Sequence, residues 1–130
     1  MMLSIAPIYA ALLALVFVAL SLNVIRARRS ARISIGAAGN APLERRMRVH
    51  ANFAEYAPLA LVLLTMAELR GAPSLLLHAL CLALLLGRLA HAWGVSNPQE
   101  NLRFRVAGMG LTFASLIGTA LLLLLGGFMR

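Results

Sequence analysis

Long apolar runs separated by short polar segments dominate this chain. Strongly apolar runs lie at residues 3–25, 52–69, 74–95 and 106–129, and the first and last of them carry no charged residue. Each run is close to the length of about 20 residues that a helix needs to cross a bilayer. The first run has no basic segment before it and no small-residue cleavage site, so we expect a retained helix and not a signal peptide. The pattern predicts an all-α fold, an integral membrane four-helix transmembrane bundle.

Glycine, proline and charged residues mark the breaks between these runs. The first connection reads RARRSARISIGAAGNAP over residues 26–42, and Pro42 suits the first turn of the next helix, which we expect to begin near Leu43. Residues 70–74, RGAPS, favour a tight turn, and residues 96–101, SNPQEN, favour a second loop. No repeat or second domain is indicated. Residues 1–130 are therefore predicted to form one transmembrane domain.

Composition and charge agree with a lipid bilayer as the surrounding solvent. The chain is 62% hydrophobic and 12% charged, with a mean hydropathy of +0.88, whereas soluble domains have about 45–50% apolar and about 25% charged residues. The net charge of +8 comes from twelve arginines, but these lie at the ends of apolar runs and do not form a soluble basic face, which argues against nucleic acid as a partner. Basic residues collect on cytoplasmic loops. We therefore expect the loops between the first and second and between the third and fourth helices to be cytoplasmic, with both termini outside.

One face of the second predicted helix carries polar groups into the membrane. At about 100° per residue, one stripe holds Arg45, Arg48, Asn52, Glu55 and Leu59, while Arg46 and His50 fall on the opposite side. An ionisable residue inside a membrane usually faces the bundle interior with a partner and marks a functional site. Two interpretations stay open here. The stripe lines a binding site, or the arginines anchor the helix at the membrane boundary while Glu55 pairs with Arg48 to fix packing.

The other helices bring arginine to the same membrane boundary. Arg88 and His91 lie three residues apart on the third helix, Arg105 enters the fourth, and Arg26 and Arg28 end the first. Arginines that extend their side chains to the membrane surface would show the same distribution without any ligand. Several guanidinium groups and one recessed carboxylate, however, suit a ligand with several carboxylates and an ammonium group. Glutathione fits this description, as do other amino-acid conjugates.

Other candidate residues are interpreted as structural. We expect His50 at a helix or subunit contact and Cys81 as a packing residue. We expect His78 near the outer end of the third helix, facing the membrane interface. No His, Cys, Asp and Glu spacing resembles a metal site. The late glycines suit close helix packing; they are Gly108, Gly110 and Gly118.

The second helix also resembles a known family. It carries the pattern E-R-x-x-R-x-x-x-N-x-x-E as Glu44, Arg45, Arg48, Asn52 and Glu55, followed by Tyr56 and Pro58. This pattern resembles the MAPEG family, the membrane-associated proteins in eicosanoid and glutathione metabolism. The stretches SLNVIRARRSARIS and GRLAH are similar to other parts of members of that family. The resemblance covers essentially the whole chain, and we expect a protein of a bacterial inner membrane.

The resemblance implies a homotrimer that holds glutathione at the subunit interface near the cytoplasmic face. By motif, glutathione would contact Arg48, Asn52, Glu55 and Tyr56, with Glu55 pairing with its ammonium group. Arg28, or alternatively Arg26, would contribute from the first helix. An arginine at the start of the fourth helix would stabilise the thiolate. Arg105 is our choice, with Arg103 as the alternative. Arg45, Arg88 and His91 complete the predicted site.

This site predicts glutathione conjugation or glutathione-dependent peroxide reduction on a lipophilic small molecule, with glutathione as cosubstrate. One departure concerns the third helix, where RLAHAWGV has Trp93 and Val95 in a stretch in which the family has a tyrosine. This departure, and Ala51 in place of a family arginine, argue against the specialised eicosanoid reactions. Two alternatives remain: a non-catalytic scaffold or lipid-binding member of the same family, and a small multidrug transporter. The transporter would require a carboxylate in the first helix, which has none.

Overall fold

The computed structural model describes residues 3–126 as four long helices joined by short connections. They are α1 (Ala6–Ala31), α2 (Ala41–Leu69), α3 (Ser74–Ser96) and α4 (Leu102–Leu125). All four are long and apolar enough to cross a membrane, and residues 3–126 contain no strand. The predicted all-α transmembrane bundle is confirmed.

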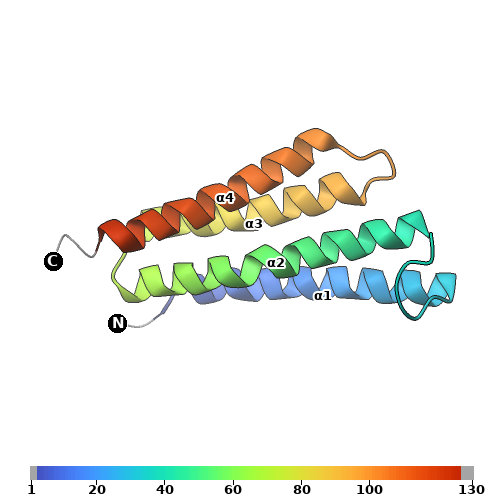
Figure 1. Ribbon diagram of the computed structural model, residues 1–130. Coiled ribbons are helices and arrows are strands. Elements are labelled where there is room, and N and C mark those ends of the chain that lie inside the picture. The colour runs from blue at the N-terminus through green and yellow to red at the C-terminus, as the bar shows by residue number, and fades with distance from the viewer. Residues whose placement is uncertain (1–2, 127–130) are drawn as a thin grey trace.

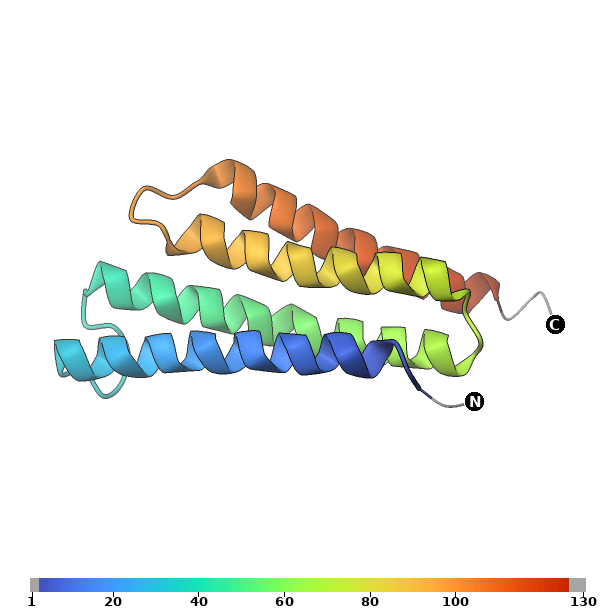
Figure 2. The same cartoon turned by 180° about the vertical axis from the view of Figure 1, so that it is seen from behind.

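The helices run antiparallel in two neighbouring pairs. Figures 1 and 2 show α1 beside α2 and α3 beside α4, with the two pairs diverging toward one end of the bundle. That end carries both longer connections, residues 32–40 and 97–101. The opposite end carries the turn between α2 and α3, the start of α1 and the end of α4. The arginine-rich segments therefore meet at one end of the molecule.

The first and last helices differ in their bounds from those expected. α1 continues past Ile25 to Ala31, so the first residues of the basic connector are helical. It ends where Arg32 adopts a left-handed conformation with φ of 56°. α4 begins at Leu102 and not near residue 106, because the side chain of Asn101 accepts a hydrogen bond from the Phe104 N–H at 3.3 Å and caps the helix. The expected end at Met129 lies outside the described residues.

Large apolar side chains pack between the helices and also cover the outside. The core contains Leu13 of α1, Phe53 and Leu64 of α2, and Leu77 and Leu84 of α3. Many other leucines, isoleucines and valines are exposed on all four helices. An apolar surface this extensive is what hydrocarbon contact requires.

Glycines let α3 and α4 approach each other closely. A Cβ atom added at Gly94 would lie 2.6 Å from the Arg105 backbone nitrogen, and one at Gly108 would lie 2.6 Å from the Gly87 carbonyl oxygen and contact the His91 nitrogen. Gly118 meets a Leu80 methyl group. Within the single chain, Gly110 makes no such contact, because it lies on the side of α4 that faces away from the bundle.

A carboxylate anchors the start of α1 to the end of α2. Glu68 accepts hydrogen bonds from the backbone N–H groups of Ser4, Ile5 and Ala6, at 2.6 to 2.7 Å. These N–H groups at the helix start have no partner within the helix. Glu68 is itself buried. The contact therefore pairs the Glu68 carboxylate with the free N–H groups of α1 and fixes the end of the α1–α2 pair opposite the long connections.

Of the residues predicted to be structural, His50 and Cys81 occupy packing positions, whereas His78 lies at the surface. His50 stacks on Phe17 of α1, with ring centroids 4.8 Å apart, and its Nε2 lies 3.1 Å from the Ser21 hydroxyl. His78 lies exposed near the start of α3, with its Nδ1 3.2 Å from the Tyr9 hydroxyl. Cys81 is fully buried.

Candidate functional site

A polar cavity lies at the end of the bundle that carries the long connections, between α2 and the α3–α4 pair. Its volume is about 320 Å³, within the range of about 300–1,000 Å³ typical of small-molecule sites. It is lined by Ala41, Glu44, Arg45, Arg48, Asn52, His91, Val95, Glu100 and Arg105. Five of these residues come from the polar first half of α2, which explains why that half of the helix carries so few apolar side chains.

The stripe on α2 rotates gradually out of the cavity. Arg45 and Asn52 are half-buried and face α3, whereas Arg48 and Glu55 are exposed. At about 100° per residue, Glu55 lies about 60° around the helix from Asn52. Within one chain Glu55 does not line the cavity. The expectation that Glu55 faces the interior of its own bundle is therefore not met, because the stripe is too wide for one side of α2.

Arg88 lies behind the cavity wall and orients Asn52. Its side chain is 1% exposed. One guanidinium nitrogen donates to the Asn52 side-chain oxygen at 2.6 Å, and Nε donates to the Thr112 hydroxyl at 3.0 Å. The guanidinium also lies 5.5 Å from the centre of the Tyr56 ring. Because the Asn52 oxygen is occupied by Arg88, the amide nitrogen of Asn52 remains as the donor for a ligand.

The floor and mouth of the cavity come from α3 and α4. His91 is buried and lines the cavity. Arg105 reaches it from the first turns of α4, while Arg103 does not line it. Gly94 positions Arg105 here, since any side chain at Gly94 would collide with the Arg105 backbone. Of the two arginines considered for the thiolate, Arg105 is the one that the helix directs into the cavity.

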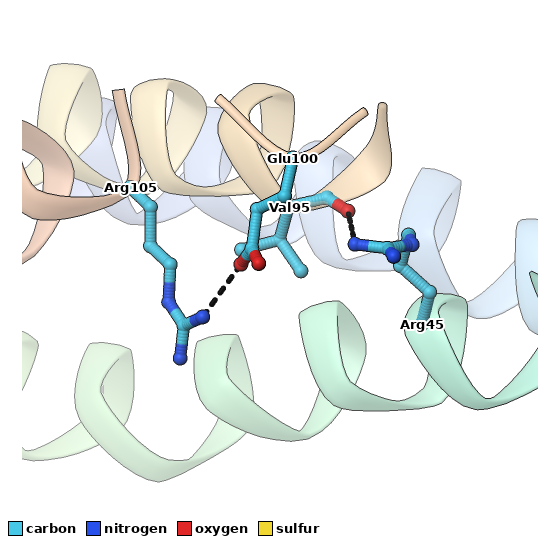
Figure 3. A network of polar contacts seen from close by, with 4 residues as sticks. All are labelled: Arg45, Val95, Glu100 and Arg105. Carbon is cyan, nitrogen blue, oxygen red and sulfur yellow. Dashed lines mark hydrogen bonds and ion pairs between the residues drawn. The ribbon is translucent and has the colours of Figure 1, made fainter. Parts of the chain in front are cut away.

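Two arginines at the mouth already bind acceptors of the chain itself. Figure 3 shows Arg45 donating to the Val95 carbonyl oxygen at 3.2 Å and Arg105 paired with the Glu100 carboxylate at 2.5 Å. Glu100 lies in the loop between α3 and α4. No helical spacing connects this loop residue with the site, so our prediction missed it. Its only signal was an acidic residue five positions before Arg105.

Several predicted site residues lie away from the cavity of the single chain. Arg28 donates instead to backbone oxygens of the connector, at 3.3 Å to Ser34 and 2.8 Å to Gly36. Arg26 and Arg103 are exposed, and Tyr56 packs edge-on against Phe113 below the cavity. The structure thus brings together Arg45, Arg48, Asn52, His91 and Arg105, and leaves out Arg26, Arg28, Glu55, Tyr56, Arg88 and Arg103. Among residues 3–126, no cluster of three His, Cys, Asp or Glu side chains could hold a metal ion.

Comparisons with known proteins agree with the fold. The model of the MAPEG family matches residues 6–125. The inner membrane protein YecN of Escherichia coli strain K12 is 34% identical over 113 residues, which cover 87% of this chain and 85% of that protein. The YecN of Escherichia coli O6:H1 has the same identity and coverage. Together with the four apolar helices, this likeness identifies a multi-pass protein of the inner membrane.

Proposed function

The chain belongs to the MAPEG family, and we propose that it binds glutathione in the cavity between α2, α3 and α4 and transfers it to lipophilic electrophiles or uses it to reduce lipophilic peroxides. Glutathione-related catalysis is known for the family in general. The observation that carries the proposal is the cavity itself, with three arginines, two glutamates and an asparagine at one membrane boundary.

The charges of this cavity complement those of glutathione. The tripeptide has two carboxylates, one ammonium group and one thiol. Arg45 and Arg48 offer planar guanidinium groups, which bind carboxylates through paired hydrogen bonds. Glu44 is an acceptor for the ammonium group, and the amide nitrogen of Asn52 is a donor for a peptide carbonyl. Each kind of polar group on the ligand therefore has a counterpart in the wall.

Arg105 is the proposed catalytic residue. A free thiol has a pKa of about 8.5, so only about 3% of it is thiolate at pH 7. A guanidinium beside the sulfur favours the thiolate and lowers the thiol pKa. In conjugation, the thiol proton passes to solvent, the sulfur attacks an electrophilic carbon, a C–S bond forms, and the leaving group departs with the bonding electrons. Phe104 and Val106, exposed apolar neighbours of Arg105 on α4, would face substrates dissolved in the bilayer.

We also propose that the site is completed in a homotrimer. Glu55 is exposed in the single chain, about 16 Å further along α2 than Glu44 at about 1.5 Å per residue. A carboxylate at this depth is costly against lipid and usually faces protein. Arg26, which is exposed in the single chain, is the α1 arginine proposed to reach the cavity of a neighbouring subunit. Arg28 would follow only if it left the connector.

The proposed orientation places the cavity on the cytoplasmic side. Seven arginines lie between residues 26 and 48, at the end of the bundle where the cavity opens. Cysteines introduced at Ser34 and Ala72, in a Cys81→Ala background, should react with a membrane-impermeant maleimide in opposite vesicle orientations. Labelling of Ser34→Cys from the periplasmic side would contradict the orientation.

The test of the function is glutathione binding and conjugation of an aryl halide by the purified protein. Arg105→Ala should remain folded and bind glutathione while losing most of its thiolate absorbance and conjugation rate. Arg103→Ala is the matched control, because it removes the same charge from the same turn without touching the cavity, and it should retain both. A thiolate band that persists in Arg105→Ala would overturn the role of this residue. Absence of binding at millimolar glutathione would favour a non-catalytic scaffold.

A further inference from the structure

Glu100 makes an ion pair with Arg105, the arginine proposed to stabilise the thiolate. The Glu100 carboxylate lies 2.5 Å from the Arg105 guanidinium, and both residues line the cavity. Figure 3 shows the Arg105 side chain extending toward α2 with the Glu100 carboxylate beside it. An anion of the chain thus occupies the position where an anionic group of a ligand would contact Arg105.

The loop that carries Glu100 is well placed to hold it there. Asn101 follows Glu100 directly and caps α4, while its own backbone N–H donates to the Gly94 carbonyl oxygen at 3.0 Å. The residue next to Glu100 is therefore fixed to both α3 and α4, the two helices on this side of the cavity. The pair itself is partly open to solvent, with side chains that are 49% and 33% exposed. A partly exposed pair is weak enough for a competing anion to replace it.

We propose that Glu100 is a positioning residue that holds Arg105 in the empty site and must release it when the sulfur anion of the ligand binds. This inference rests on the proposed function. Glu100 competes with any anion at the sulfur position and sets how much more tightly the site binds an anionic sulfur group than a neutral one. Groups of the ligand that contact the arginines of α2 do not compete with it.

Two ligands separate this competition from general charge effects. Glutathione sulfonate carries a permanent anion at the sulfur position, and S-methylglutathione carries none, whereas their carboxylates and ammonium group are the same. In Glu100→Gln the affinity for the sulfonate should rise by about two- to fivefold, which is the range of an exposed ion pair. The affinity for S-methylglutathione should change by a clearly smaller factor, because this ligand has no anion at the sulfur position. The ratio of the two affinities is the readout that a merely structural role would leave unchanged.

Two further variants make the test specific. Glu44→Gln removes the same charge from the same cavity but makes no ion pair with Arg105, so it should shift both ligands alike and leave their ratio unchanged. In an Arg105→Gln background, Glu100→Gln should no longer alter the ratio, because the competing contact is already gone.

The outcomes distinguish this inference from the proposed function. If the wild-type protein binds both ligands and Glu100→Gln leaves their ratio unchanged, the role of Glu100 is wrong and glutathione binding stands. A fall in sulfonate affinity in Glu100→Gln would also overturn it, since Glu100 would then support the ligand. If neither ligand binds the wild-type protein or the variant, both the function and the inference fail.

Discussion

Arg88 is a buried cation for which the described part of the chain provides hydrogen bonds but no carboxylate. Its partners are the Asn52 oxygen, the Thr112 hydroxyl and the Met109 sulfur. Hydrogen bonds to a charged group contribute about 1.5–3 kcal/mol each, while a charge at the centre of a membrane helix costs about 2.5–3.5 kcal/mol or more. Taken together, the hydrogen bonds at least offset the minimum cost of burying the charge. Arg88 therefore matters more for the direction of Asn52 than for the stability of the bundle.

Arg88→Met tests this division of roles. Methionine fills most of the same space without the charge, so we expect the free energy of unfolding to change by less than about 1 kcal/mol. Glutathione affinity should fall by about five- to tenfold, or roughly 1–1.4 kcal/mol, because the Asn52 amide is free to rotate. Thermal unfolding in detergent and calorimetric titration measure the two quantities.

Asn52→Ala supplies the control for this prediction. In that background, Arg88→Met should cause no further loss of affinity, since the residue that Arg88 orients is absent. A loss of stability clearly above about 1 kcal/mol in Arg88→Met alone would contradict the prediction, because the hydrogen bonds of Arg88 would then stabilise the bundle and not only orient Asn52.

At the residue scale, helical spacing predicted part of the cavity and could not predict the rest. The 3.6-residue period placed Arg45 and Asn52 on one side of α2, and they do line the cavity. The same period does not show how much of that side a neighbouring helix covers. Glu55 was therefore expected to face the interior, although it is exposed in the single chain. Glu100 lies in a loop whose path depends on the spacing between α3 and α4, and no local pattern encodes that spacing.

The contact between α3 and α4 depends on residues that have almost no side chain. Gly108 packs against the backbone of Gly87 and His91, and Arg105 lies one turn earlier on the same helix. Small residues allow transmembrane helices to approach closely. The separation of these two helices therefore fixes how far Arg105 extends into the cavity.

Gly108→Ala should destabilise the bundle and disturb the site. The added methyl group would collide with backbone atoms that cannot rotate away, so we expect a loss of about 1–3 kcal/mol, measured by thermal unfolding in detergent, together with weaker glutathione binding. Gly110→Ala is the matched control. It adds the same methyl group two residues later into open space, and alanine is the better helix former by about 0.5–1 kcal/mol. Equal effects of the two substitutions would refute the packing role of Gly108.

The ends of α1 and α4 show that hydropathy predicts the membrane-spanning part of a helix but not where the helix begins or ends. The apolar run predicted an end for α1 near Ile25, yet the helix continues through Arg28 and Arg29 to Ala31. Arginine is a good helix former, so a helix does not need to end where the hydrocarbon ends. α4 begins at Leu102, before its apolar run starts, because Asn101 caps the helix there.

For the whole molecule, the central question is what covers the exposed side of α2. This side carries Arg48 and Glu55 in the same helix as exposed apolar residues such as Leu59 and Met66. Lipid alone would solvate the apolar residues and leave the carboxylate unfavourably placed. A neighbouring subunit could cover the apolar residues and also offer an arginine to the Glu55 carboxylate. The two possibilities predict opposite signs for one substitution.

Glu55→Leu should lower the stability of the assembly and the population of trimers if a subunit covers this side. The loss expected from an unpaired arginine in the neighbour is about 3–5 kcal/mol, seen as a lower thermal midpoint and as monomers in native mass spectrometry. If Glu55 faced lipid, the same substitution would remove a costly charge from hydrocarbon and raise the thermal midpoint. Met66→Leu, at an exposed position on the same helix, is the control and should change neither measurement. A rise in stability for Glu55→Leu would refute the proposed trimer contact and, with it, the view that the glutathione site is completed by a second subunit.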